Sequence, residues 1–121
     1  MSKELAFILE DRKLYIEKNI VIINIPLFFT CVDDDDQKYL VLCFDDENLK
    51  YLIAKTTNVD LIKMLNSETN LREPFKNSIK LWIVESGFDI KDDKVQPIKY
   101  HCIPTEFLPK KGAFLDLKNS S

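Results

Sequence analysis

The run of four aspartates at residues 33–36 is the group in this sequence most suggestive of chemistry. Several carboxylates that converge on one point can bind Ca²⁺ or Mg²⁺ through their oxygens. A calcium-binding EF-hand loop that began at Asp33 would need glycine at its sixth position and glutamate at its twelfth, but Lys38 and Phe44 stand there. We therefore expect a solvated turn without a metal, in which aspartate side chains accept hydrogen bonds from local backbone groups.

A second acidic turn, at residues 45–47, does not complete a metal site. The strand expected between the two turns, residues 38–44, would hold them about 20–24 Å apart at ~3.4 Å per residue. Acidic turns can also imitate the phosphates of a nucleic acid and occupy the groove of a basic protein. A strong mimic of that kind carries a larger negative charge than the net −3 of this chain, so we do not favour it.

The single histidine, His101, is followed directly by Cys102. Adjacent side chains on a strand point to opposite faces, so the two do not form a Cys–His catalytic pair by themselves. They also supply only part of the ligand set that a zinc site requires. We expect Cys31 to lie opposite Tyr39 on the neighbouring strand, which leaves Cys43 too far along that strand for a disulfide. All three cysteines are read as small apolar residues in a reducing compartment.

No motif for nucleophilic or phosphate chemistry is present. The sequence has no Gly-x-Ser-x-Gly, and its only glycines, Gly87 and Gly112, do not form a phosphate-binding loop. Arg72, in the segment Arg-Glu-Pro-Phe, is the residue best suited to bind an anion or a carboxylate with two parallel hydrogen bonds. The alternative, which we favour, is that Arg72 ties a loop to an acidic turn while Phe75 lies in the core.

Composition limits the class of protein. A chain of 121 residues with 45% hydrophobic and 31% charged residues is typical of one globular domain. We expect that domain over residues 1–118, with residues 119–121 as a frayed tail. The net charge of −3 argues against direct binding to a nucleic acid. No apolar run is long enough to cross a membrane and the first residues lack a secretory signal, so we expect a cytoplasmic protein.

The elements that must position these residues begin with a three-stranded meander. Three apolar runs of strand length, at residues 27–32, 39–44 and 49–54, are separated by the two acidic turns. Both faces of the first two strands are apolar, whereas a sheet with one face in water would alternate apolar and polar residues. These strands are therefore covered on both sides, or one of their faces binds a partner.

The remaining elements are predicted from shorter patterns. Residues 5–9 and 14–16 could form a hairpin or one amphipathic turn of helix, of which we favour the strands. The β-branched run at residues 19–25 favours a strand. Asn58 is the predicted N-cap of the main helix, Val59–Asn66, and a second short helix is expected at residues 71–76. A hairpin over residues 79–99 has Pro97 on an edge strand or at a bulge. The tail should extend over the body and be held by Phe107, Leu108, Phe114 and Leu115.

These elements together predict an α+β fold. We expect a single small domain with an antiparallel sheet of five or six strands, made of the meander at 27–54 and the hairpin at 79–99. One main short helix and an extended C-terminal wrap complete it.

The order of the segments resembles a family of small bacterial domains of unknown function. The resemblance covers residues 26–117. It rests on a Pro-Leu strand, an acidic turn, a short helix, an Arg-acidic-x-Phe step at residues 72–75, a strand with Trp82 and a Leu-Pro-x-x-Gly tail. Pro74 departs from the pattern and is expected to shorten the second helix. The resemblance implies a bacterial or phage cytoplasmic source, and it brings no activity, cofactor or catalytic residue.

We expect a non-enzymatic interaction protein, a small bacterial or phage partner or inhibitor of a larger assembly such as a defence or counter-defence component. The surface for a protein partner, or for self-association, would be an apolar sheet face. That face would carry Phe28, Leu40 and Leu42 and would be rimmed by Asp34 and Asp35.

Two other functions stay open. The first alternative is a module that binds a nucleotide or an anion, with Arg72, Trp82 and Tyr100 as pocket residues. The second is an enzyme with His101 or a carboxylate as general base, which we do not favour. We expect no cofactor, no metal and no membrane association.

Overall fold

The computed structural model describes residues 4–23, 25–87 and 92–109. Within these residues, seven strands form one antiparallel sheet in chain order, each hydrogen-bonded to the next. They are β1 (Leu5–Leu9), β2 (Arg12–Ile23), β3 (Ile25–Val32), β4 (Lys38–Asp45), β5 (Lys50–Thr56), β6 (Leu81–Glu85) and β7 (Lys94–Ile98). The predicted count of five or six strands is wrong, because β1 and β2 join the same sheet as the meander.

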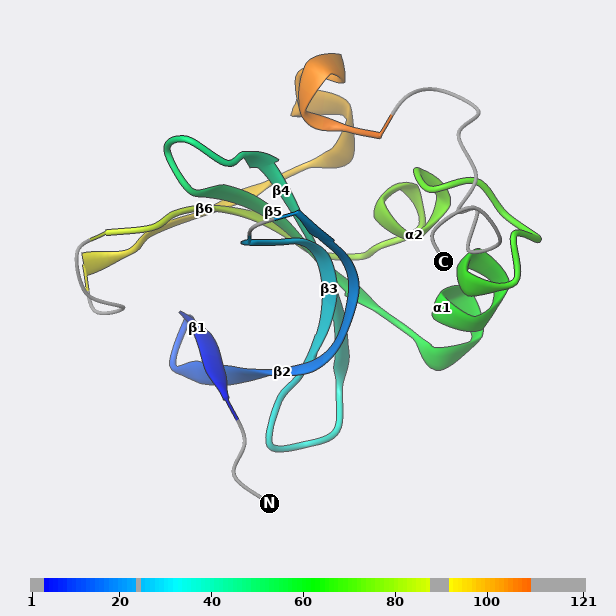
Figure 1. Ribbon diagram of the computed structural model, residues 1–121, viewed down its shortest axis with the longest axis horizontal. Helices are drawn as coiled ribbons and strands as arrows, with labels where there is room; N and C mark the ends of the chain where they lie inside the picture. The colour runs from blue at the N-terminus through cyan, green and yellow to red at the C-terminus, as the bar shows by residue number, and fades with distance from the viewer. Residues whose placement is uncertain (1–3, 24, 88–91, 110–121) are drawn as a thin grey trace.

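The sheet curls into a half-barrel (Figure 1). The long strand β2 shifts its register against β3 at three points, between Ile16 and Lys18, Asn19 and Val21, and Val21 and Ile22. The first two shifts leave an extra residue on β2 and the third leaves one on β3, and such residues bend a strand and increase its twist. The bends allow the β1–β2 hairpin to fold over the concave side, while both helices lie on the convex side (Figure 1).

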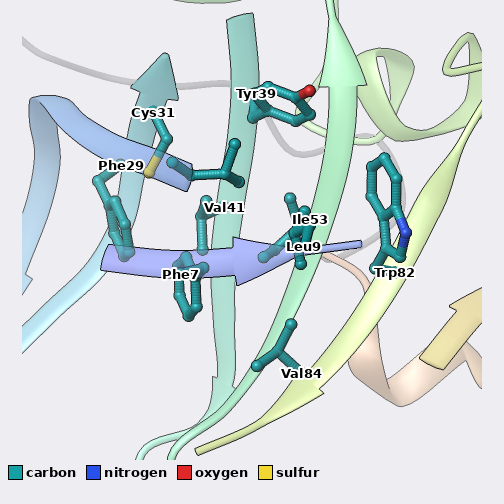
Figure 2. Close-up of a cluster of buried hydrophobic side chains, with 10 residues drawn as sticks. Phe7, Leu9, Phe29, Cys31, Tyr39, Val41, Ile53, Trp82 and Val84 are labelled. Carbon is teal, nitrogen blue, oxygen red and sulfur yellow. The ribbon is translucent and has the colours of Figure 1, made fainter. Parts of the chain in front are cut away.

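The two faces of the sheet carry two separate hydrophobic clusters, because successive side chains of each strand alternate between them. Figure 2 shows the concave cluster, in which side chains of β1 meet those of the central strands. Its buried members are Phe7, Leu9, Leu14, Phe29, Cys31, Tyr39, Val41, Ile53, Trp82 and Val84. The buried members of the convex cluster are Phe28, Leu40, Leu52, Ala54, Leu61, Met64, Phe75, Leu81 and Ile103. Both apolar faces of the central strands are therefore covered by the chain itself.

Two helices cover the convex face. Helix α1 (Asn58–Leu65) is capped by Thr57, whose hydroxyl accepts a hydrogen bond from the backbone N–H of Asp60 at 3.2 Å, so the prediction of Asn58 as the cap is wrong by one residue. It buries Leu61 and Met64. Helix α2 (Glu73–Lys76) has Pro74 in its first turn, where a missing N–H costs nothing, and buries Phe75 completely.

The C-terminal part of the described chain begins at the edge strand β7. Pro97 lies in this strand opposite Trp82, which confirms its predicted edge position. The segment after it is not extended, because it forms two 3₁₀ turns, η2 (Tyr100–Cys102) and η3 (Thr105–Phe107). Phe107 and Leu108 pack against the convex cluster as predicted. The predictions for Phe114, Leu115 and the frayed end lie outside the described residues.

The two-residue turn between β1 and β2 has an unusual sequence. Glu10 and Asp11 both have positive φ angles, 46° and 75°, between the paired residues Leu9 and Arg12. A hairpin turn of this shape favours Asn-Gly or Asp-Gly, because a residue with a Cβ is strained in the left-handed region.

Substitution of Asp11 by glycine is therefore expected to raise the free energy of unfolding by about 0.5–1 kcal/mol. Urea denaturation of the variant and the parent protein measures the change. Asp34→Gly is the matched control: Asp34 is an exposed aspartate in another hairpin turn, and its φ angle is not positive. That substitution should be slightly destabilising, and equal effects at both positions would contradict the assignment of strain to Asp11.

Candidate functional site

A pocket of about 320 Å³ lies at the margin of the convex cluster. We call it the apolar pocket, and its lining residues are Phe28, Leu42, Cys43, Phe44, Leu71, Glu106, Phe107, Leu108 and Pro109. One wall comes from β3 and β4, where Phe28 and Leu42 are directly opposite each other in the register. The other wall comes from η3 and the residues after it. All but one of the lining residues are apolar, so the pocket is suited to an apolar group.

An aromatic pair joins the two walls. The rings of Phe44 and Phe107 stack with their centroids 4.2 Å apart and their planes 16° from parallel. Phe44 lies on β4 two residues after Leu42, so both side chains point to the same face of the strand. Phe44, Leu42 and Phe107 are half-buried, so they keep surface available to a ligand. The pocket is thus an open extension of the core.

The rim of the apolar pocket is acidic in part, and Arg72 lies beside the same pocket. Glu106 lines it and is exposed. Asp45 and Asp46 directly follow the lining residues Cys43 and Phe44 along the chain. Burial is the main reason that the pKa of Cys43 is raised, and the negative charges of Asp46 and Asp45 raise it further. A basic group beside the pocket would therefore be stabilised by these carboxylates.

Arg72 holds the end of the described tail. Its Nε donates a hydrogen bond to the backbone carbonyl of Pro109 at 2.6 Å, and Pro109 lines the pocket. The Asn70 side chain accepts hydrogen bonds from the backbone N–H groups of Arg72 and Glu73, which fixes the start of α2. The sequence correctly indicated that Arg72 ties a loop, but its partner here is a carbonyl of the tail and not an acidic turn.

The three apolar residues predicted for an interaction face occupy different environments. Phe28 and Leu42 line the apolar pocket. Leu40 lies in the middle of the convex cluster and has 0% of its surface exposed, so the folded chain has no Leu40 surface to present to a partner. The half-buried Leu42 is the member of the set that remains accessible.

The residues predicted for a ligand pocket do not meet in one place. Trp82 belongs to the concave cluster, whereas Tyr100 packs against the convex cluster on the other side of the sheet. Arg72 lies next to the apolar pocket, bound to Pro109. A single site built from these three side chains is therefore not formed.

The acidic turn between β3 and β4 is organised by Asp33, which is only 2% exposed. Its Oδ1 accepts hydrogen bonds from the backbone N–H groups of Asp35 and Gln37 at 2.8 and 3.0 Å. Its Oδ2 accepts from the Tyr39 hydroxyl at 2.9 Å and from Arg12 at 3.1 Å. We call these contacts the Asp33 network, and they make the turn a structural element.

The lowered pKa of Asp33 agrees with its structural role in the turn. Burial alone would raise the pKa of Asp33, but the hydrogen bonds from Gln37, Tyr39, Asp35 and Arg12 together lower it. Asp35 also accepts a hydrogen bond from Arg12 at 2.9 Å, and Asp34 is exposed. Both of these residues were predicted to rim an apolar face. Strand β3 carries the chain about 14 Å from Phe28 to its end at Val32, at ~3.4 Å per residue, and both aspartates lie in the turn beyond that end, so they are not part of the pocket rim.

The cysteines lie in different environments, and His101 and Cys102 lie together in the exposed turn η2. Cys31 is completely buried, and burial, with a smaller contribution from the charge of Glu17, raises the pKa of its thiol to about 12. The register places Cys31 opposite Tyr39, as predicted, and both Cys31 and Cys43 are free thiols. Cys102 is exposed, so it does not pack in the core as a small apolar residue. Across the described ranges, no three His, Cys, Asp or Glu side chains are grouped to hold a metal ion.

Sequence reasoning missed two of the residues that shape the apolar pocket. Phe44 shares a strand face with Leu42, so the period of two along β4 was a signal that could have identified it. Phe107 is brought to the pocket by a tertiary contact between segments 63 residues apart, and no local pattern predicts such a contact.

No helix of the described residues is long and apolar enough to cross a membrane. Comparisons of the chain with protein-family models, with curated proteins and with solved structures found no match. The resemblance to small bacterial domains therefore stays an expectation, and the argument for function depends on the geometry of the site.

Proposed function

We propose that this protein is a non-enzymatic interaction protein that binds a partner protein through the apolar pocket and its acidic rim. The observation that supports this most directly is an open, almost wholly apolar pocket beside exposed carboxylates. The complementary partner is a segment with one large apolar side chain, such as Leu, Met or Phe, flanked by Lys or Arg. The apolar side chain would enter the pocket, and the basic residues would lie near Glu106 and Asp46.

The size of the pocket favours one anchoring side chain over a whole small molecule. Its volume of about 320 Å³ is at the lower end of the range for ligand pockets, ~300–1,000 Å³. Complete burial of one Leu or Phe side chain contributes roughly 1.5–3 kcal/mol. Interfaces commonly depend on a few such anchors, surrounded by polar contacts that fix the orientation. The rim carboxylates would therefore determine which partners are accepted more than how tightly they bind.

Coverage of both sheet faces by the chain favours a foreign partner over a second copy of this protein. The residues that self-association would have used are in part internal, as the complete burial of Leu40 illustrates. A bacterial or phage assembly, such as a defence or counter-defence complex, is the biological setting that we propose for the partner. That setting comes from the family resemblance alone.

The proposal predicts the sequence of the peptides that this protein selects. Selection from a random peptide library should enrich an apolar anchor with basic neighbours, and fluorescence anisotropy then gives the Kd of the enriched peptides. Leu42→Ala should weaken their binding about tenfold, because part of one buried anchor contact is lost. Glu106→Lys should also weaken it, and the effect should decrease at high salt.

Two substitutions elsewhere serve as controls. Leu49→Ala removes the same atoms from a leucine that is 38% exposed and does not line the pocket, and Glu68→Lys reverses an exposed charge beyond α1. Neither should change the Kd. The proposed site would be refuted if the selection enriched no common motif. It would also be refuted if the enriched peptides bound the Leu42→Ala and Leu49→Ala variants equally well.

A further inference from the structure

A second cavity, of about 80 Å³, lies at one end of the concave face, far from the apolar pocket. We call it the polar cavity. It is enclosed between the β1–β2 turn and the strands β4, β5 and β6, and Figure 2 shows Leu9, Tyr39 and Trp82 around this region. The polar or charged residues that line it are Glu10, Arg12, Tyr39, Lys55, Lys80 and Trp82. Its volume exceeds what one water molecule needs.

Trp82 contributes a buried donor that lies near the Glu10 carboxylate but forms no hydrogen bond of normal geometry with the described residues. Its side chain is part of the concave cluster, only 4% exposed, and its Nε1 forms no hydrogen bond within the described part of the chain. Its ring is held in place by Tyr39, 6.1 Å away between centroids, and by Lys80, whose Nζ lies 5.3 Å from the ring centroid. A buried donor without a partner is costly, so such a group calls for an explanation.

Three of the side chains around the polar cavity, those of Glu10, Arg12 and Tyr39, already have partners. The Glu10 carboxylate accepts a hydrogen bond from Lys80 Nζ at 2.7 Å. That bond is the main cause of the lowered pKa of Glu10, to which the nearby Trp82 indole adds. Arg12 is paired with Asp33 and Asp35 on the outer side of the turn. The Tyr39 hydroxyl donates a hydrogen bond to Asp33.

The cavity therefore has more donors than acceptors. Lys55 lines it, and among the residues that the structure describes its ammonium forms no ion pair. Lys80 has three N–H donors, of which the Glu10 contact uses one. Together with the Trp82 N–H, these lining groups leave one positive charge and several donors around a small volume. A ligand with several acceptor oxygens and a negative charge matches that arrangement.

We propose that the polar cavity binds a small oxyanion, either free inorganic phosphate or the phosphate or carboxylate group of a small ligand. The oxyanion accepts hydrogen bonds from Trp82 Nε1, Lys55 and Lys80. The Glu10 carboxylate lies beside the same donors and competes with the ligand for Lys80. This site is independent of the apolar pocket and of the partner proposed there.

The single tryptophan makes the test direct, because the chain has one Trp and hence one indole N–H signal in a ¹H–¹⁵N spectrum. The signal should shift in a saturable way as inorganic phosphate is added, with ionic strength held constant by sodium chloride. Acetate in a parallel titration distinguishes a tetrahedral oxyanion from a carboxylate. Either anion that saturates the shift supports the site and identifies the preferred chemistry.

Three substitutions, all at partly or fully exposed positions, test the roles of the lining groups. Lys55→Gln should weaken binding about tenfold, the loss expected for one charge-assisted hydrogen bond. Glu10→Gln should strengthen it, because the competing carboxylate is removed. Lys63→Gln, on the convex side in α1, is the control and should leave it unchanged. A shift that sodium chloride reproduces, or equal affinities in all variants, would show that the cavity holds only water and would overturn the proposal.

Discussion

Replacement of Asp33 by alanine is expected to lower the free energy of unfolding by about 2–4 kcal/mol, although the residue belongs to a turn that looks solvated in the sequence. Four donors converge on its carboxylate: two backbone N–H groups, the Tyr39 hydroxyl and the Arg12 guanidinium. Alanine would leave the buried donors without acceptors, at a cost of roughly 1–3 kcal/mol for each one that water does not reach. The partly exposed Arg12 adds little to the loss.

Asp34→Ala is the control for this prediction. Asp34 is the neighbouring aspartate and is exposed, so its replacement should change the free energy of unfolding by no more than about 0.5 kcal/mol. Urea denaturation followed by circular dichroism measures both variants. Equal losses of stability at the two positions would contradict the Asp33 network and would support a solvated turn, as expected from the sequence.

The same network makes stability depend on pH in a defined direction. The pKa of Asp33 is lower in the folded chain than in the unfolded chain, where a free aspartate titrates near ~3.9. The ionised carboxylate therefore stabilises the fold fully above the unfolded pKa, and this contribution is lost as the pH falls through the folded pKa. The difference in stability between the parent protein and Asp33→Ala should thus be constant near neutral pH and should shrink below about pH 4.

The meander was predictable because its information is local. Acidic turns separate apolar runs of strand length, and the length of the first turn determines that Cys31 faces Tyr39, as the register confirms. The β1–β2 hairpin was harder to assign. Its turn, Glu10-Asp11, lacks the Asn-Gly signal of a two-residue hairpin, and two extra residues in β2 interrupt the strand pattern.

The candidate site was predictable only in part. Phe28 and Leu42 were identified because they are large apolar residues on one face of adjacent strands. The sequence could not reveal that Leu40, on the same face, is covered by the helices, since that depends on where α1 and α2 pack. Similarly, Arg12 and Asp33 are 21 residues apart, and their contact exists because β2 and β3 are paired.

Leu40→Ala is expected to be the most destabilising of the substitutions considered, with a loss of about 3–5 kcal/mol. Leu40 lies on the central strand β4, has 0% of its surface exposed and is surrounded by the convex cluster. Alanine removes three carbon atoms from close-packed surroundings, and the cavity that remains adds to the lost transfer free energy. Because such a loss is a large part of the stability of a small domain, the measurement should start at low denaturant concentration.

Leu42→Ala provides a matched comparison, because it removes the same atoms two residues further along the same face of β4. Leu42 is half-buried and lines the apolar pocket, so the cavity term is small and the expected loss of stability is about 1–1.5 kcal/mol. The two leucines thus separate core packing from pocket lining, which the sequence could not distinguish. Substitution of Leu40 mainly lowers stability, whereas substitution of Leu42 mainly weakens the binding of the selected peptides. If Leu40→Ala instead left stability unchanged, the helices would not cover the convex face, and that face would be exposed to partners as the strand pattern alone allowed.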